Sequence, residues 1–276
     1  MASLVNMRFV CEQVSFPVCS VLFDNKVHAK YPARAISVGA VNIYSPYSVM
    51  FLVLAIWLSF ILVQRTSRMY SFPARREMLL FLHVYIFALF LDLLLCCGVV
   101  RYSWKYLYVS VVSMQLACVV SSFVAMMSTG LVWIFPNRMS SVCTAFSRLM
   151  TFSSLSMAFF AMVISIPLSL GVCVFTLLYA MPLFFFSLFC FTQLAKLKQL
   201  NAEVWAYGAI VVSVLLFVLL GMTSYFLGMV IVLISDRYLD GVFLAHLISF
   251  FGVLQIYNLW SIDNEKEIEC VNTVKT

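Results

Sequence analysis

Charged residues are scarce in this sequence, and their scarcity indicates its class. Only 10% of the 276 residues are charged, against roughly 25% in a soluble domain. Hydrophobic residues make up 64% of the chain, and the mean hydropathy is +1.05. No stretch longer than about forty residues lies outside the apolar pattern, which leaves no room for a soluble catalytic domain. We therefore expect an integral membrane protein with a single membrane domain.

A basic patch is missing too. The formal net charge is +6, but the Lys and Arg residues lie in short loops between apolar runs. Basic residues in such loops set the orientation of membrane helices. We therefore expect the lipid bilayer, and no nucleic acid, as a partner of these charges.

The sequence also lacks motifs for metals, cofactors and catalysis. Its three histidines are far apart, and no Cys/His cluster has the spacing of metal ligands. No G-x-S-x-G motif supports a serine hydrolase, although the many serines leave that chemistry formally open. We predict no catalytic residue, no metal site and no cofactor, and hence a protein that is not an enzyme.

Long apolar runs are what the chain has in abundance, and about twenty apolar residues cross a bilayer as a helix. They predict an all-α fold, a polytopic membrane protein with a seven-transmembrane-helix bundle. We divide the chain into an N-terminal segment (1–44), the transmembrane domain (45–260) and an acidic tail (261–276). Pro167, Ser169 and Gly171 predict a tight hairpin between the fourth and fifth spans. The fifth span then ends near 195, and the other six cover about 45–64, 77–100, 108–135, 146–168, 204–235 and 241–260.

Basic residues in the loops predict the orientation. The loops after the first, third and fifth spans carry four, two and two Lys or Arg residues, with Arg148 in the first turn of the fourth span counted in the third loop, and those after the second, fourth and sixth carry two, none and one. Basic loops stay in the cytosol, so we expect a lumenal N-terminus and a cytosolic C-terminus. Four basic residues in the N-terminal segment weaken this argument, but only Lys30 and Arg34 are close to the first span.

Ionisable residues inside the spans are few, and each costs roughly 2.5–3.5 kcal/mol to insert. The candidate polar residues are His83 and Asp92 in the second span and Gln115 in the third. His83 and Asp92 are nine positions apart, which turns them about 180° from each other on a helix, so they form no site by themselves. We expect Asp92 to face the bundle or to reach water near the end of its span. A transport or ligand-binding role stays open.

Small and polar residues recur at three- and four-residue steps along the third span, where they predict a helix-packing face. They are Gln115, Cys118, Ser122, Ala125 and Thr129. The glycines of the last two spans invite the same interpretation. These are Gly208, Gly221, Gly228 and Gly252.

The last span begins after a polar turn that contains Tyr238, Leu239, Asp240 and Gly241. Asp240 is a candidate N-cap for the helix that follows. Tyr257 and Trp260 close the span as aromatic anchors. We interpret the turn as a structural element first and as a direct partner contact second.

Five of the nine cysteines lie inside apolar runs, where Cys behaves as a small hydrophobic residue. Cys11 and Cys19 are the candidate disulfide. A lumenal N-terminus is in an oxidising compartment, and the seven residues between them permit a bridge without requiring one. Two unpaired, partly buried thiols are the alternative.

Several of these patterns together resemble the fungal chitin synthase export chaperone family. They are C-x7-C at 11–19, A-R-A-I at 33–36, Cys97-Gly98, Gln115, Y-L-D-G-V-F at 238–243 and Y-x-x-W at 257–260, followed by an acidic tail. The resemblance covers nearly the whole chain, and its two ends are the most specific parts.

The resemblance implies a non-enzymatic, multi-pass protein of the endoplasmic-reticulum membrane. Such a chaperone helps a chitin synthase fold and reach the cell surface, which supports cell-wall chitin synthesis. A chitin synthase is then the membrane-protein client, and the tail after Trp260 contacts that client or the export-vesicle coat machinery.

Two other classes share the predicted topology. A seven-span receptor has the same arrangement, but the short loops and tail leave little surface for a cytosolic transducer. A small-solute or lipid transporter needs a polar cavity at mid-membrane, for which Asp92, Gln115 and His83 are the lining candidates.

Overall fold

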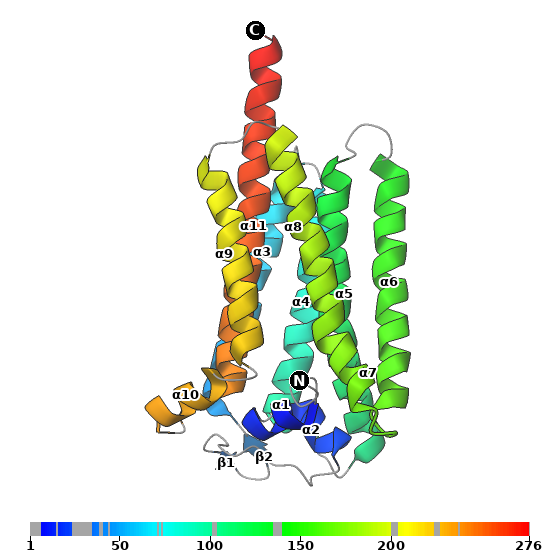
Figure 1. The fold of residues 1–276 in the computed structure, drawn as a ribbon, viewed down its shortest axis with the longest axis vertical. Coiled ribbons are helices and arrows are strands. Elements are labelled where there is room, and N and C mark those ends of the chain that lie inside the picture. Colours follow the sequence, from blue (N-terminus) through cyan, green and yellow to red (C-terminus); the bar gives the residue numbers. More distant parts are fainter. Residues whose placement is uncertain are drawn as a thin grey trace.

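Seven long helices form a bundle, with the chain termini at opposite ends (Figure 1). Each of the seven, within the described residues, is long and apolar enough to cross a membrane, which confirms the all-α, seven-helix prediction. The computed structural model describes residues 7–14, 16–23, 35–38, 41–43, 45–70, 72, 74–100, 104–134, 140–199, 204–223, 227–236 and 238–275. The A-R element of the resemblance lies outside them.

The first five spans agree with the apolar runs to within a few residues. The first four are α3 (Pro46–Arg68), α4 (Arg75–Cys96), α5 (Lys105–Ile134) and α6 (Ser140–Ser165). The fifth combines α7 (Gly171–Phe175), the π-helical turn η1 (Thr176–Ala180) and α8 (Met181–Gln199). Pro182 has no N–H to donate, and a local π turn satisfies backbone groups that a proline frees. Between α6 and α7 lies the tight turn that Pro167 and Ser169 predict, with Ser169 at φ 53°.

The predicted sixth span, 204–235, is wrong in its second half. The membrane helix α9 ends earlier (Val204–Met222), and a separate helix α10 (Gly228–Ile234) turns away from it at the end of the bundle (Figure 1). About twenty residues suffice to cross a bilayer, so the apolar remainder is free to fold back. Periodicity alone did not mark this break.

The last helix, α11 (Gly241–Lys275), continues past the predicted end of its span at Trp260. Its final turns project beyond the other helices (Figure 1). The segment 261–276, which we separated as a tail, therefore extends the seventh helix through residue 275.

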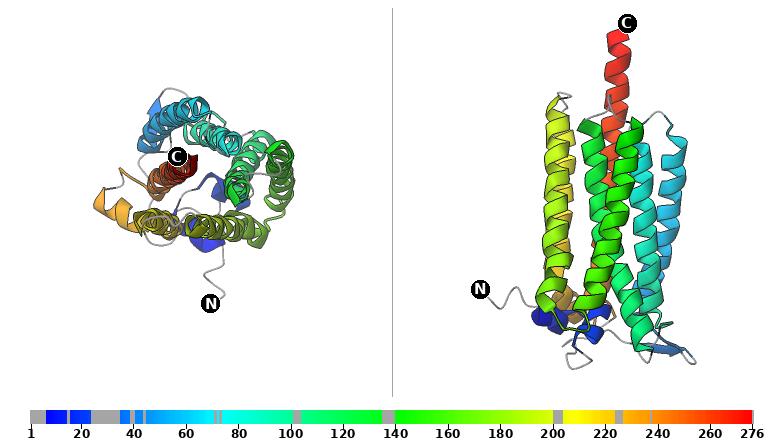
Figure 2. Two further views of the ribbon diagram at one scale, coloured as in Figure 1. Left: turned by 90° about the horizontal axis from the view of Figure 1, so that it is seen from above. Right: turned by 90° about the vertical axis from the view of Figure 1, so that its right-hand side faces the viewer.

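The N-terminal segment folds against the opposite end of the bundle. It contains two short helices, α1 (Met7–Gln13) and α2 (Pro17–Leu22), and an antiparallel pair of three-residue strands, β1 (Ile36–Val38) and β2 (Val41–Ile43). The strand pair is absent from the sequence prediction because such short strands carry no periodic signal. We call α1 and α2 the N-terminal cover, their end of the bundle the covered end, and the other the tail end (Figure 2).

Helix α5 lies inside the bundle and packs against α4, α6 and α8. Cys118, Ala125 and Thr129 of the predicted packing face are buried. Beside them, Gly130 is in such close contact with α8 that a Cβ there would overlap the Thr192 hydroxyl oxygen. A glycine is therefore required at this crossing.

The predicted packing role of the other glycines holds at one position and fails at three. A Cβ on Gly228 would lie 2.8 Å from the Thr223 carbonyl oxygen. Added Cβ atoms on Gly208, Gly221 and Gly252 would meet no atom of the described residues within 4 Å. Those three glycines do not mediate close helix contacts.

Candidate functional site

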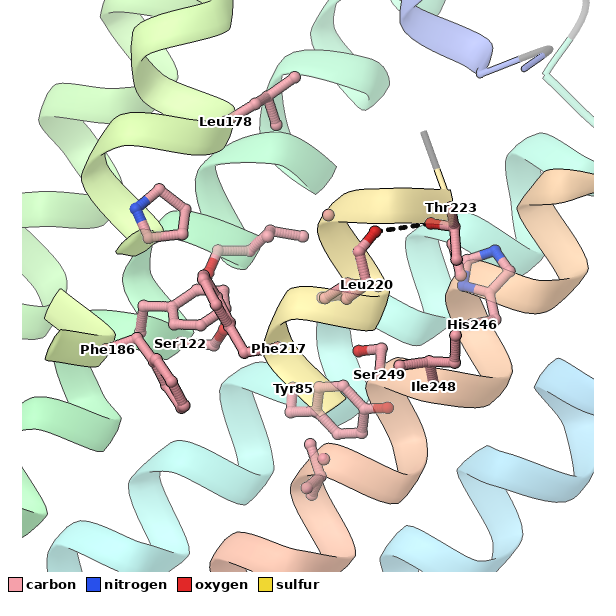
Figure 3. A pocket seen from close by; sticks show the side chains of 18 of the residues that line it. Tyr85, Ser122, Leu178, Phe186, Phe217, Leu220, Thr223, His246, Ile248 and Ser249 are labelled. Atoms are coloured by element: carbon pink, nitrogen blue, oxygen red, sulfur yellow. Dashed lines mark hydrogen bonds between the residues drawn. The ribbon is translucent and has the colours of Figure 1, made fainter. Parts of the chain in front are cut away.

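The bundle contains a cavity of about 510 Å³ whose wall is mostly apolar. Its lining comes from α4, α5, α8, α9 and α11, and Figure 3 shows side chains from these walls around the open space. Met7, Pro17 and Val18 of the N-terminal cover also line it. The cavity therefore extends from the covered end past the middle of the bundle, where Phe81 and Ile256 line it, and its size is in the range of small-molecule sites.

A polar cluster from three helices projects into this cavity. Asp92 on α4 lies 3.9 Å from His246 on α11, measured from carboxylate oxygen to ring Nδ1. The Gln115 amide on α5 contacts the Asp92 carboxyl group. All three residues line the cavity. Asp92 thus faces the bundle interior, where an imidazole and an amide offset the cost of burying a carboxyl group.

Two polar atoms of the wall have no hydrogen-bond partner among the described residues. They are the Tyr85 hydroxyl and the Nε2 atom of His246. Ser249 lies beside Tyr85 (Figure 3) without good hydrogen-bond geometry. A buried polar atom without a partner costs about 1–3 kcal/mol. Such atoms mark places where a bound group with hydrogen-bonding capacity stabilises the protein.

The structure brings two of the three predicted intramembrane polar residues together and excludes the third. His83 lies on an exposed face of α4, where its Nδ1 is 2.6 Å from the Leu79 carbonyl oxygen. His83 and Asp92 lie on different sides of α4, as their nine-position spacing predicts, so of the three lining candidates for a transporter His83 does not line the cavity. His246 takes its place. Sequence reasoning missed this pair because nothing in the sequence shows which spans are neighbours.

Asp240 joins the start of α11 to the start of α3. Its carboxylate oxygen accepts a hydrogen bond from the Phe243 N–H at 2.8 Å and one from the Ser48 hydroxyl at 3.3 Å. Ser48 also bonds to Ser45 at 2.8 Å. Asp240 therefore has the geometry of an N-cap and in addition connects two spans.

The neighbours of Asp240 in the turn also pack within the protein. The Tyr238 ring meets the Tyr47 ring edge-on at 6.2 Å between centroids. The Leu239 N–H donates to the Ser235 hydroxyl at 3.1 Å. These contacts support the structural interpretation of the turn.

Position 241 has no room for a side chain. A Cβ on this residue would lie 2.8 Å from a methyl carbon of Val14 and 3.0 Å from the Cα atom of Gly228. The N-terminal cover, α10 and α11 therefore meet at a point where only glycine fits.

Trp260 is a core residue. It is 1% exposed, and its ring lies 5.4 Å from that of Phe72 and 5.9 Å from that of Tyr257. Tyr257 is buried as well. A membrane-interface anchor must reach the headgroup region, so the aromatic-anchor interpretation is wrong for these two residues. They pack the tail end of the bundle instead.

A disulfide joins Cys11 to Cys19 and so connects α1 with α2. Both cysteines are buried in an apolar cluster that includes residues of α4, α5, α6 and α7. The Ser169 hydroxyl donates to the Leu22 carbonyl oxygen at 3.2 Å and ties the N-terminal cover to the turn between α6 and α7.

Three buried polar residues at the tail end were missed by sequence reasoning. Glu77 on α4 and Gln193 and Lys196 on α8 are all nearly inaccessible, and both amide atoms of Gln193 have no hydrogen-bond partner among the described residues. Glu77 and Lys196 sit at the ends of predicted spans. In the described part of the chain no three His, Cys, Asp or Glu residues are grouped as for a metal ion.

A family model described as chitin synthase export chaperone matches residues 3–273 of the chain. The match includes the N-terminal cover, all seven spans and most of the tail. No curated protein and no solved structure matches the chain.

Proposed function

We propose that this chain, which belongs to the chitin synthase export chaperone family, is an endoplasmic-reticulum membrane chaperone that helps a chitin synthase fold and leave for the cell surface. The observation that carries this proposal is the extent of the family match, residues 3–273. The described structure suits a partner embedded in the same bilayer, since seven apolar helices form most of it.

The chaperone acts in our proposal through its lipid-facing helices. A client helix associates with another helix in a membrane through van der Waals packing and interhelical hydrogen bonds. The outward faces of α3, α6, α8 and α9 carry many exposed, large apolar side chains. These faces can cover spans of an unfinished client until its own helices pack.

Helix α6 is the strongest candidate for the client-contacting face. It lies at the edge of the bundle, with α5 as its main neighbour (Figure 2). Its exposed side includes Ser153 and Ser156, whose hydroxyls donate to their own helix at the carbonyls of Met150 and Phe152. Small hydroxyl residues let a second helix approach closely and can bond across the contact.

The tail supplies a second contact in this proposal. Residues 263–269 of the sequence include four acidic residues, and α11 extends beyond the bundle at that end. The charge distribution of the loops favours a cytosolic tail. There the tail would meet the client or the export-vesicle coat machinery.

Localisation of a chitin synthase tests the function directly. We expect the synthase to accumulate in the endoplasmic reticulum of cells that lack this protein, while other secretory cargo leaves normally, as seen by microscopy and cell fractionation. A synthase that reaches the surface unaffected would contradict the proposal and bring the receptor and transporter alternatives forward.

Substitutions on α6 test the contact face. Replacing both serines, Ser153→Leu with Ser156→Leu, should reduce co-purification of the synthase several-fold, because two bulky side chains block close approach. Ser110→Leu on α5 is the control, since Ser110 is also exposed and bonded to its own helix, and α5 is not among the client-covering helices. Equal losses in both variants would argue against α6.

A further inference from the structure

The cavity has a sideways opening between α8 and α9. Leu183 on α8 and Val218 on α9 both line the cavity, and they are 54% and 51% exposed. The two helices diverge toward the covered end (Figure 1). Half-exposed wall residues on two helices that diverge mark a mouth, through which the cavity communicates with the bilayer.

The opening is bounded on two sides. Toward the tail end, the rings of Phe186 and Phe217 stack at 4.3 Å between centroids and join α8 to α9. Toward the covered end, Met7 and Val18 of the N-terminal cover close the space. The mouth therefore lies between the Phe186–Phe217 stack and the N-terminal cover.

The chemistry of the wall selects an uncharged polar group. Asp92 and His246 form its ionisable pair, and the lining contains no Lys or Arg among the described residues. An anionic phosphate headgroup would meet a carboxyl group without a cation to compensate it. A hydroxyl group suits the wall better, because it can donate to the unpaired His246 Nε2 and accept from the Gln115 amide.

The size of the cavity limits the apolar part of the ligand. A dry cavity of about 150 Å³ holds one benzene molecule, so about 510 Å³ holds roughly 20 non-hydrogen atoms. That is the size of a sterol ring system with its hydroxyl and less than a lipid with two acyl chains. A client helix is too large, since a helix with its side chains is about 10–12 Å across and fills such a volume in about one turn.

The depth of the polar cluster in the bundle also matches the depth of an amphiphile's hydroxyl group in a bilayer. Asp92 lies four residues from the end of α4, which is about 6 Å along a helix. A hydroxyl placed there is near the membrane surface, and the apolar wall between it and Phe186 runs toward the middle of the bilayer. An amphiphile in the bilayer has this same orientation.

We propose that the cavity binds a membrane sterol, which enters between α8 and α9 and places its hydroxyl at Asp92, Gln115 and His246. This site is separate from the exposed side of α6 and goes beyond the chaperone role. Sterol binding and client export are therefore separable properties.

Photolabelling of the full-length protein in lipid nanodiscs tests the proposal. A photoactivatable sterol with a clickable tag should label peptides of α8, α9 and α11 saturably, and excess unmodified sterol should compete. Leu183→Trp fills the mouth at a half-exposed position and should reduce labelling at least fivefold. Leu219→Trp is the matched control, because Leu219 is adjacent to Val218 and exposed but does not line the cavity. It should label like the unsubstituted protein.

Three results would overturn the site. The first is labelling that does not saturate and spreads over the outward faces of all helices. The second is full labelling of Leu183→Trp. The third is competition by diacylglycerol as strong as that by sterol, which would assign the cavity to a different lipid. None of these results bears on the localisation of the synthase, so failure here is distinguishable from failure of the chaperone proposal.

Discussion

Single polar residues connect helices of this protein that are distant in sequence. Asp240 accepts hydrogen bonds from the N–H of its own helix and from Ser48 on α3. Asp92 meets His246 across the cavity. In a chain with 10% charged residues, each such contact specifies which helix ends are neighbours, a function that apolar packing alone performs poorly in lipid.

Asp240→Ala should destabilise the protein by about 1–2 kcal/mol, because an N-cap is lost together with the contact to Ser48. Asp240→Asn keeps an acceptor oxygen and should lose less. Thermal unfolding in detergent measures both. If Asp240→Ala retains the stability of the unsubstituted protein yet fails to support export of the synthase, the turn contacts the client directly.

Asp92 and His246 should show energetic coupling in a double-mutant cycle. Asp92→Leu and His246→Leu each leave one buried polar group without its partner, whereas the double variant removes both. We expect the double variant to be more stable than the sum of the singles predicts, by about 1–2 kcal/mol, in reversible unfolding from mixed micelles. The control pair is Asp92→Leu with His83→Leu, which should be additive because His83 points outward.

At the level of helices, close crossings and local breaks determine the shape of the bundle. α5 and α8 approach closely at Gly130, whereas α8 and α9 diverge to open the cavity. The π turn before Pro182 and the break between α9 and α10 both lie in the covered half. Regular packing toward the tail end and irregular helices around the cavity thus coexist in the same spans.

Glycine substitutions distinguish a close helix crossing from a position with open space around it. Gly130→Ala should destabilise the protein, because the new methyl group overlaps the Thr192 side chain. Gly208→Ala has open space around its Cβ and should be neutral or stabilising by up to about 1 kcal/mol, since alanine favours a helix. Melting temperatures of the two purified variants provide the comparison. A Gly130→Ala variant as stable as Gly208→Ala would mean that α5 and α8 are not in close contact.

Considered as a whole, the molecule is a helical bundle with a cover of two short helices packed against one end. The cover is held by apolar packing, by the Ser169–Leu22 hydrogen bond and internally by the Cys11–Cys19 disulfide. It also forms part of the cavity wall. Loosening the cover should therefore affect the cavity more than the spans.

Replacing both bridged cysteines by serine tests this coupling. The closed loop is short, and the chain-entropy relation gives a loss of about 2–3 kcal/mol for it. We expect a lower unfolding temperature, weaker sterol photolabelling and unchanged membrane insertion. Cys97→Ser with Cys173→Ser is the matched control, because both thiols are free and only partly buried. Identical unfolding temperatures for the two variants would contradict a stabilising role of the bridge.

The number of spans and the family were accessible from the sequence because each depends on local information. An apolar run of sufficient length predicts a bilayer crossing whatever its neighbours are. The patterns at 11–19 and 238–243 carry the resemblance to the family, which the family match over 3–273 supports. The tight turn at Pro167 was predictable for the same reason, since proline restricts the chain locally.

Only the tertiary structure decided which polar residues meet. Asp92 and His246 lie on different spans, and no pattern of the sequence states that α4 and α11 are close enough for contact. A tryptophan at position 260 is compatible with either a lipid-facing or a buried position. In the folded chain it packs against Phe72 in the core. The sequence by itself determined a seven-helix membrane protein of the chitin synthase export chaperone family, because hydrophobicity and motifs are properties of short segments. The cavity, its mouth between α8 and α9 and its cover required the folded chain, because they arise from packing between segments far apart in sequence.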